Sequence, residues 1–363
     1  MSTYRGNENF RHGLPDVIGV LLSNLGTPDD CTSAATRRYL AEFLSDPRVV
    51  EMPRWLWRVI LHGVVLRVRP ARAAHAYRRV WMAEGAPLLV ISQRQAQALE
   101  EALAAQSGPS VRVALGMRYG RPSIAAALAA LRDAGARRIL VLPLYPQYSS
   151  ATTASTFDAV CRELGTWRWV PELRMVTHYH DDPWYVSAVA GSLRDAWRSR
   201  ERPERVLFSF HGMPLRTLHA GDPYFCQCQK TARAVAEELQ LDAGQWAIAF
   251  QSRFGREKWL QPYTDVTLRS WGHAGVRSVD VVCPGFSADC LETLEEVAML
   301  NRDNYLKAGG REFHYVPALN DRPEHIAGLV DLIRRHTAGW STERPAAEAE
   351  ESRRRALALG ARQ

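Results

Sequence analysis

Residues 206–214 read Val-Leu-Phe-Ser-Phe-His-Gly-Met-Pro, and the prediction of the fold starts from this stretch. Its apolar run predicts a buried strand of a parallel sheet, and Gly212 and Pro214 end that strand at once. His211 is therefore expected at the carboxyl edge of the sheet, where open α/β folds bind their ligands. An imidazole titrates near neutral pH, so His211 can exchange a proton or bind a metal. The alternative is a histidine that only hydrogen-bonds a loop, and this stretch by itself favours that alternative.

Apolar runs of the same kind recur along the chain, and helix-like segments separate them. This alternation predicts an α/β fold in which helices flank parallel sheets. A length of 363 residues is enough for about two such units. The other predicted strands are residues 17–22, 111–115, 139–144, 247–250 and 279–283, and the predicted helices include 93–105, 123–134, 231–239 and 291–301.

The spacing of these elements allows one parallel sheet in each half of the chain. We predict an N-terminal lobe at 15–185 and a C-terminal lobe at 186–330, with a loop at 178–183 before the boundary. The tail at 341–363 is rich in Ala, Glu and Arg and has no strand signals. We expect this charged tail to be a frayed helix or poorly ordered.

The composition is that of an ordinary globular protein, with 46% hydrophobic and 23% charged residues. A net charge of +7 is compatible with an anionic small molecule or an acidic membrane surface as ligand. No basic run with interleaved aromatic residues indicates a nucleic-acid partner. The N-terminus does not resemble a secretory signal, and the six cysteines do not have the spacing of a disulfide framework. We therefore expect a cytoplasmic protein.

One segment, at about 54–90, differs from the rest, and we call it the lip. Between Trp55 and Tyr77 it mixes apolar residues irregularly with arginines on one or two expected helices. An ordinary pair of surface helices is one interpretation. The other is a hydrophobic rim that covers a ligand and contacts a membrane peripherally. Its longest charge-free apolar run, 59–66, is far shorter than the roughly 20 residues of a spanning helix.

Three carboxylates follow the last predicted strand. On a helix Asp289, Glu292 and Glu296 would fall within an arc of about 60°. Carboxylates gathered on one face are unfavourable unless they bind a cation, contact water or share protons. Asp289 and Glu292 also have the spacing of an N-cap residue and its N3 partner, so capping of the helix is the alternative.

The remaining motifs indicate less chemistry. The glycines form neither a dinucleotide-binding nor a P-loop pattern, and the chain has no GxSxG or HExxH motif, which leaves hydrolase mechanisms little support. Cys226 and Cys228 form a single CxC without a second pair at zinc-site spacing, so we interpret them as ordinary thiols. His178 and His180 are likewise interpreted as structural.

Taken together, the motifs resemble the ferrochelatase family, and in particular its proteobacterial branch. The matching stretches occur in order along most of the chain, and their order and spacing make the resemblance specific. They are residues 21–28, 39–48, 77–87, 118–119, 142–153, 209–214, 221–233, 250–262 and 283–296.

The resemblance implies two Rossmann-like lobes with a porphyrin cleft between them. It also implies a lyase that inserts ferrous iron into protoporphyrin IX to form protohaem. His211 and Glu292 are then expected on opposing sides of the metal-insertion site, as catalytic residues and metal ligands. Asp289 and Glu296 match acidic neighbours on a proton or metal path. The porphyrin-binding residues implied by the resemblance are Leu25, Arg78, Arg79, Arg118 and Tyr119.

The cysteines depart from the pattern of some family members. Those members hold a [2Fe–2S] cluster with one mid-chain cysteine and three cysteines near the C-terminus. Here Ser150 occupies the mid-chain position and no cysteine follows Cys290, whereas four thiolates are the usual requirement. We therefore predict no such cluster and no cofactor beyond the substrate iron.

The implied residues fit the chemistry of metallation. The reaction replaces pyrrole N–H protons with a divalent ion, so a base such as His211 is needed near the ring centre. Imidazole and carboxylate hold ferrous iron without the tight grip of several thiolates, and arginines pair with the propionates of the porphyrin. His211 either accepts protons or binds iron first. The alternatives are a chelatase for coproporphyrin or another metal, a porphyrin or haem carrier without catalysis, and a two-lobed protein for another anion.

Overall fold

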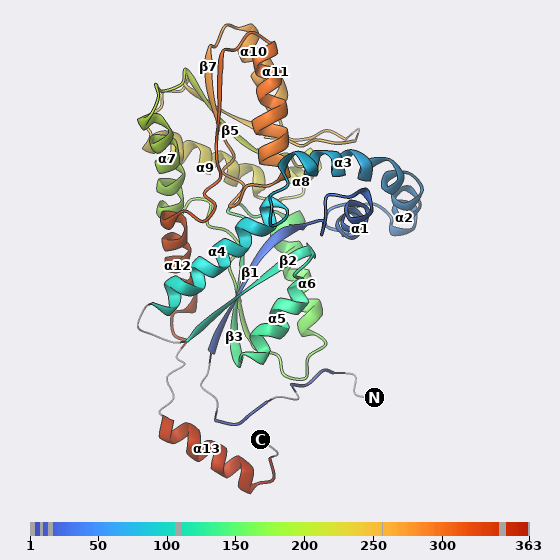
Figure 1. The fold of residues 1–363 in the computed structure, drawn as a ribbon, viewed down its shortest axis with the longest axis vertical. Coiled ribbons are helices and arrows are strands. Elements are labelled where there is room, and N and C mark those ends of the chain that lie inside the picture. The colour runs from blue at the N-terminus through green and yellow to red at the C-terminus, as the bar shows by residue number, and fades with distance from the viewer. Residues whose placement is uncertain are drawn as a thin grey trace.

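The computed structural model describes residues 4–7, 10–13, 17–105, 110–255, 257–340 and 346–361. It contains two four-stranded sheets whose paired strands run parallel, and helices flank both sheets (Figure 1). This arrangement confirms the predicted α/β fold with one parallel sheet in each half of the chain.

The first sheet has the strand order β2-β1-β3-β4. The apolar run of β1 lies inside the sheet, so Val20, Leu21 and Leu22 are fully buried. β4 was not among the predicted strands, because this edge strand has only four residues, two of them charged, and carries no apolar run. The strands are β1 (Val17–Thr27), β2 (Val111–Gly120), β3 (Ala136–Pro143) and β4 (Glu172–Met175).

The second sheet repeats this order as β6-β5-β7-β8, so the two lobes share one topology. The strands are β5 (Arg205–His211), β6 (Trp246–Gln251), β7 (Ser278–Val282) and β8 (Glu312–Val316). The apolar run around Phe208 forms β5, a buried strand with parallel neighbours on both sides, and His211 is its last residue. The buried parallel strand was predicted. Because parallel strands end at the same edge, His211 lies on the side from which the loops after β6 and β7 emerge.

Helices of two kinds surround the sheets. The α-helices are α1 (Ser33–Leu44), α2 (Arg54–Ile60), α3 (Leu66–Val80), α4 (Pro87–Ala104), α5 (Ile124–Asp133), α6 (Ser155–Leu164), α7 (Pro183–Arg198), α8 (Leu215–His219), α9 (Tyr224–Glu238), α10 (Thr264–His273), α11 (Arg302–Lys307), α12 (Pro323–Thr337) and α13 (Ala346–Ala358). The π-helical segments are η1 (Leu61–Val65), η2 (Ser150–Ala154) and η3 (Glu292–Asn301). π-Helical turns are rare and frequently occur at functional sites, and η3 replaces most of the α-helix expected at 291–301.

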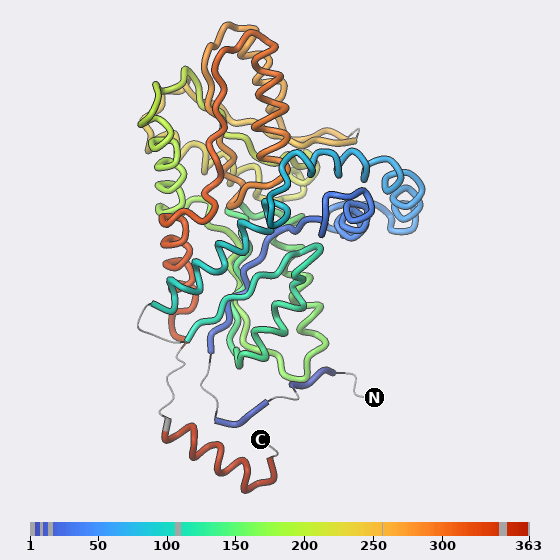
Figure 2. The backbone as a smooth tube through the Cα atoms, viewed as in Figure 1, coloured from blue at the N-terminus to red at the C-terminus, as the bar shows by residue number. Residues whose placement is uncertain are grey.

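A common core joins the two lobes. Leu22 and Leu140 of the first sheet belong to the same hydrophobic cluster as Phe208 and Val282 of the second sheet. α12 follows the second sheet in the chain, yet it packs against α4 and β3 of the first lobe. Figure 2 shows this return, with the red α12 beside the cyan α4. The lobe limits at 15–185 and 186–330 therefore stay a prediction, because the packing does not separate the two sheets.

The C-terminal tail includes α13, which lies apart from both sheets and beside the N-terminal segment at Gly13 (Figure 2). Residues 15–16 of the predicted first lobe, and residues 341–345 and 362–363 of the predicted tail, lie outside the described residues. In the part of the chain that the structure describes, no helix is both long and apolar enough to cross a membrane.

Candidate active site

His211 ends β5 at the carboxyl edge of the second sheet, as predicted. Gly212 makes the following turn, since a Cβ at this position would lie only 2.7 Å from the carbonyl oxygen of Gln251. His211 Nδ1 lies 2.7 Å from the Gly212 carbonyl oxygen, which can only accept, so Nδ1 carries a proton. In the neutral ring Nε2 then keeps its lone pair and can accept a proton or bind a metal. The Tyr224 hydroxyl fixes this strand end by donating to the His211 carbonyl oxygen at 3.0 Å.

η3 carries Glu292 and Glu296 to the same edge of the sheet. Ser252 follows β6 with a left-handed φ of 65°, and it donates its backbone N–H to Glu296 Oε1 at 2.8 Å and its hydroxyl to Oε2. The Gln251 side chain donates to the carbonyl oxygen of Glu292 at 3.4 Å. Because Gln251 pairs with His211 across β5 and β6, these bonds bring the acidic helix toward the histidine.

The two glutamates and the histidine influence one another electrostatically. Burial raises the pKa of the Glu296 carboxyl above its usual value, and the Glu292 carboxylate adds to this shift. Hydrogen bonds from Ser252 and the neighbouring His211 oppose it. Glu296 can therefore hold a proton at a pH where an exposed glutamate has lost it. The arrangement is suited to proton exchange between the histidine and η3.

Asp289 has a different environment from the two glutamates. It is buried, its Oδ1 accepts from Thr293 Oγ1 at 2.9 Å and Tyr315 Oη at 2.5 Å, and its Oδ2 accepts from Asn320 Nδ2 at 2.8 Å. The capping interpretation of Asp289 is wrong, because Leu291 occupies the N-cap position of η3. The carboxylate of Asp289 holds the loop before η3 in place.

The first lobe supplies two tyrosines that sequence analysis did not assign to the site. Tyr39 of α1 and Tyr77 of α3 are buried, and burial raises the pKa of both hydroxyls well above the usual value. The charge of Glu292 contributes to both shifts, so both side chains lie near its carboxylate. Each tyrosine begins a stretch that carries the family resemblance, and this was the available signal.

Arg118 and Tyr119 lie near the carboxyl end of β2, where their polar groups are bound within the protein. Both donate to Asp46 Oδ2, Tyr119 at 2.8 Å, and Arg118 Nε donates to the Ser155 hydroxyl at 2.6 Å. Burial by itself would raise the pKa of Asp46, but hydrogen bonds from Ser155, the Arg48 backbone and Tyr119, with the charge of Arg118, lower it. Within this cluster the charge of Arg118 is matched by that of Asp46. Asp46 and Ser155 were not among the predicted site residues.

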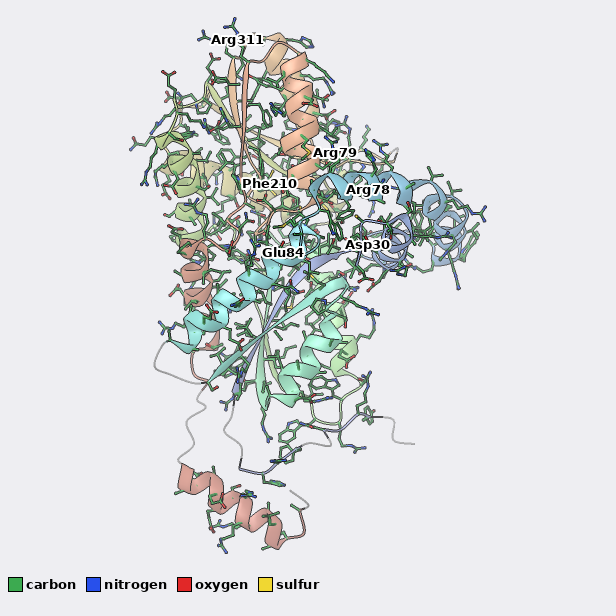
Figure 3. All side chains as sticks on the ribbon, in the orientation of Figure 1. Asp30, Arg78, Arg79, Glu84, Phe210 and Arg311 are labelled. Carbon is green, nitrogen blue, oxygen red and sulfur yellow. The ribbon has the colours of Figure 1, made fainter. Side chains whose placement is uncertain are left out.

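The lip consists of α2, η1, α3 and the beginning of α4. Near the end of α3, Arg79 Nη1 donates to Glu295 Oε1 of η3 at 2.8 Å, and this ion pair connects the two lobes. Figure 3 labels Arg78 and Arg79 where α3 approaches the helices of the second lobe. Arg78 is exposed, with Nη1 3.4 Å from the carbonyl oxygen of Cys31. Leu25 of β1 packs between the cluster around Tyr119 and the loop before η3.

The other sequence motifs lie outside this site. The rings of His178 and His180 are 5.3 Å apart, and burial lowers the pKa of His180 to about 4. Cys226 is exposed and Cys228 is buried. Among the described residues, no group of three or more His, Cys, Asp or Glu side chains is arranged to hold a metal ion. Within the described residues, neither the two histidines nor the two cysteines therefore have a third His, Cys, Asp or Glu side chain placed to complete a metal site.

Two lobes of one topology, with a strand-end histidine beside carboxylates on a π-helix, define a chelatase-like protein. The solved structure of SirB from Bacillus subtilis with Fe3+ is similar, with a TM-score of 0.53 over 88% of this chain and 96% of that chain. The two sequences are 14% identical, so this likeness concerns the fold alone.

Sequence comparisons identify the family. A family model described as Ferrochelatase matches residues 17–337. The Ferrochelatase of Nitrosococcus oceani is 55% identical over 367 aligned residues, which cover 99% of this chain and 100% of that protein. The Ferrochelatase of Methylibium petroleiphilum is 57% identical over 333 residues and 92% of each chain. The chain belongs to the ferrochelatase family, which confirms the resemblance of its motifs.

Proposed function

We propose that the chain inserts ferrous iron into protoporphyrin IX to form protohaem, with His211 and Glu292 as its catalytic residues. Membership of the family makes the chain an enzyme, a lyase of haem biosynthesis that metallates a porphyrin, and iron is its substrate. One observation carries the assignment of the residues. His211 keeps an Nε2 lone pair, and it lies beside a π-helix that begins with Glu292.

Metallation exchanges the two pyrrole N–H protons of the porphyrin for one Fe2+, so a proton acceptor is needed near the ring centre. His211 accepts these protons one at a time at Nε2, because the Gly212 carbonyl keeps Nδ1 protonated, and it passes the first proton on before it takes the second. Glu292 binds the incoming iron through its carboxylate, and imidazole with carboxylate is a ligand set from which ferrous iron is readily released. Binding of iron at His211 before deprotonation uses the same atom and is the alternative order.

The released protons leave by the acidic helix in this proposal. Glu296 accepts them, because its raised pKa lies closer to that of an imidazole than the pKa of an exposed glutamate does. Asp289 was expected on the same path. Since its oxygens accept hydrogen bonds from Thr293, Tyr315 and Asn320, we propose that Asp289 serves the path by holding η3.

The porphyrin is proposed to lie between the lobes with its propionates at the lip. Arg78 is exposed and available to a propionate, whereas Arg79 has to exchange Glu295 for it. Leu25 supplies apolar surface for the macrocycle, whereas Tyr119 is buried and supports the pocket wall from behind. Arg118 is paired with Asp46, so its part is to hold the pocket wall rather than to bind a propionate.

An anaerobic assay with ferrous iron and protoporphyrin IX, followed by the appearance of the haem spectrum, tests this function. We expect saturable turnover, and we expect Glu292→Gln to lose about 100-fold in kcat while porphyrin binding persists. Saturable porphyrin binding without turnover would indicate a carrier. Faster turnover of coproporphyrin, or of another divalent metal, would replace the proposed substrate. Wild-type turnover by Glu292→Gln would remove Glu292 from the mechanism.

We propose that the enzyme works without a [2Fe–2S] cluster. Ser150, at the position of the mid-chain ligand of cluster-containing members, accepts a hydrogen bond from Arg48 at 3.2 Å. Cys283 and Cys290 are buried, and burial raises the pKa of both thiols, which disfavours the thiolate that a cluster needs. Analysis of the purified protein should find no acid-labile sulfide. About two iron and two sulfide per chain would contradict the proposal.

We further propose a cytoplasmic enzyme whose lip touches the inner face of the membrane. Trp55 is 73% exposed and Val68 is 68% exposed, and Val59 and Val64 are exposed beside them. Apolar side chains with interleaved arginines are the composition that binds an anionic lipid surface. The arginines of this surface are Arg54, Arg58, Arg67 and Arg72.

Sedimentation with lipid vesicles tests the membrane contact. The protein should bind vesicles that contain phosphatidylglycerol more strongly than vesicles of phosphatidylcholine alone. The double variant Trp55→Ser, Val59→Ser should lose most of this binding. Val266→Ser is the matched control, since Val266 is an exposed valine on α10 outside the lip. Equal binding by both variants, or no binding by the wild type, would contradict the membrane contact.

A further inference from the structure

The loop between β7 and η3 is held by side chains from distant parts of the chain. This loop, residues 283–291, leads directly to Glu292. Its carbonyl oxygens and one of its side chains make hydrogen bonds with residues of the first lobe, including the segment that leads to the second lobe. The bonds are Gln147 Nε2 to Pro284 O at 3.1 Å, Tyr185 Oη to Pro284 O at 2.7 Å, Gln95 Nε2 to Ser287 O at 2.9 Å, and Tyr179 Oη with Ser287 Oγ at 2.9 Å.

Asn320 makes the closest connection to the end of this loop. Its Oδ1 accepts the backbone N–H of Asp289 at 2.8 Å, and its Nδ2 donates to Asp289 Oδ2 at 2.8 Å. An amide supplies an acceptor and a donor side by side, whereas an ionised carboxylate supplies acceptors alone. Asn320 also has a left-handed φ of 49°, a conformation that asparagine tolerates better than most residues. The residue is therefore selected both by its side chain and by its backbone.

Gln95 extends the connection into the first lobe. It lies on α4 and is completely buried. Its Nε2 group donates to the carbonyl oxygens of Ser287 and Asn320, both at 2.9 Å. His325 donates Nδ1 to the same Asn320 carbonyl at 2.7 Å. The Gln95 side chain of the first lobe thus binds both the loop before η3 and Asn320, whose own side chain binds Asp289.

Asp289 connects these hydrogen bonds to the first turn of η3. Its Oδ1 accepts from Thr293 Oγ1, and Thr293 Oγ1 accepts the backbone N–H of Cys290 at 3.0 Å. Thr293 is the neighbour of Glu292. A shift of Asp289 would therefore move the start of the helix that carries the Glu292 carboxylate.

We propose that Asn320 and Gln95 are positioning residues that set the place of Glu292 relative to His211. This inference rests on the proposed catalytic role of Glu292. A displacement of about 1 Å in a catalytic group can cost about 100-fold in rate, so the chain from Gln95 through Asn320 to Asp289 matters for turnover. Because Gln95 belongs to the first lobe, the acidic helix of the second lobe is correctly placed only when the lobes are in contact.

Asn320→Asp is the direct test. It replaces the donor facing Asp289 Oδ2 with a second carboxylate oxygen, which repels Asp289. We expect kcat to fall about 100-fold while the dissociation constant for porphyrin, measured by fluorescence, stays within twofold. The double variant Asp289→Asn, Asn320→Asp exchanges the amide and the carboxylate, so every hydrogen bond of the pair can form again. We expect it to recover at least tenfold in kcat over the single variant.

Control variants separate positioning from loss of folding. Asn320→Gly keeps the left-handed backbone and the carbonyl bonds to Gln95 and His325 but releases Asp289, so it should bind porphyrin and lose kcat as Asn320→Asp does. Gln147→Ala removes another buried glutamine, which donates to Pro284 at the beginning of the same loop, and its kcat should fall less than fivefold. Gln95→Leu should lose about tenfold.

Three outcomes would overturn the inference. They are wild-type kcat in Asn320→Gly, no recovery in the exchanged pair, or an equal loss in Gln147→Ala and Asn320→Gly. If instead the wild-type enzyme made no haem, the proposed function would fail, so the two failures can be told apart.

Discussion

The two sheets have the same strand order, but the titratable groups at their carboxyl edges have different surroundings. At the end of β2, Arg118 and Tyr119 both donate to Asp46, and these side chains are nearly or fully buried. At the end of β5, the His211 ring donates from Nδ1 while its Nε2 has no hydrogen-bond partner among the described residues, and Glu296 is a carboxyl with a raised pKa. One edge has each charge matched by a partner, whereas the other holds groups able to take up protons.

This difference indicates a division of labour between two lobes of one topology. The first lobe supplies a wall whose shape is fixed by internal ion pairs and hydrogen bonds. In the proposed mechanism, the second lobe supplies the side chains that change protonation or bind metal during a turnover.

His211→Ala should abolish most activity. Without Nε2 no proton acceptor stands at the end of β5, and general-base catalysis is typically worth about 100- to 10,000-fold. We expect kcat in the anaerobic haem-forming assay to fall about 1,000-fold while porphyrin binding persists. His178→Ala, at an exposed histidine outside the site, is the control and should keep normal activity. Activity of His211→Ala within tenfold of the wild type would contradict the proposed role of His211 as proton acceptor.

Asp46→Ala should damage stability more than chemistry. It leaves the Arg118 guanidinium, whose side chain is only 11% exposed, without its buried partner. Breaking a buried pair lowers the free energy of unfolding by about 3 kcal/mol or more. Urea denaturation of the variant and the wild type measures this loss. Asp158→Ala removes the partner of Arg48 in a half-exposed pair and should cost about 1 kcal/mol or less. Equal losses in the two variants would contradict the idea of a charge-matched wall.

Glu296→Gln should change the pH dependence of stability. Because burial raises the pKa of Glu296, the folded state holds this proton more tightly than the unfolded chain does. The corresponding stability is fully present below the usual value of 4.5 and is lost as pH rises through the raised value. Glutamine cannot lose a proton. The free energy of unfolding of Glu296→Gln should therefore rise relative to that of the wild type as the pH increases from 4.5 toward neutrality. Denaturation curves without iron would reveal a constant difference if this is incorrect. We also expect kcat to fall about tenfold.

Glu295→Gln should have the smallest effect. The pair with Arg79 is partly exposed, so its loss should lower the free energy of unfolding by about 0.5 kcal/mol. Arg79 would then be available to a propionate, and the KM for protoporphyrin should fall two- to threefold by this order-of-magnitude estimate. A porphyrin dimethyl ester, which lacks the propionate charges, should give the same KM for both enzymes. An unchanged KM for protoporphyrin would mean that Glu295 does not compete for Arg79.

The strands inside the sheets were predictable because burial on both faces requires an apolar run. Phe208 lies in such a run, and so do the residues around Val20. β4 and β8 were missed, since edge strands such as 312–316 mix charged, aromatic and polar residues. The π-helical turns were also missed, because α-helical spacing alone gives no indication that Glu292 begins an i→i+5 segment.

The candidate site was predictable where the chemistry of single residues was informative. His211 and the glutamates of η3 belong to local motifs, and the structure places them at one edge of the second sheet. Asp46, Tyr39 and Gln95 were not predictable by the same logic. Their importance arises from partners far away in the chain, and a lone tyrosine or glutamine in a helix carries no local signal of such a partner.

Short stretches of the chain were enough to specify two parallel sheets and a histidine at the end of one inner strand. The reason is local, since the apolar runs, Gly212 and Pro214 specify strand and turn without reference to the rest of the chain. Only the tertiary structure decided which charges are matched. Arg118 could have faced a ligand, but packing placed Asp46 against it, while Glu296 was brought beside His211. The balance between a fixed wall and a reactive edge depends on long-range contacts, which no single stretch of sequence contains.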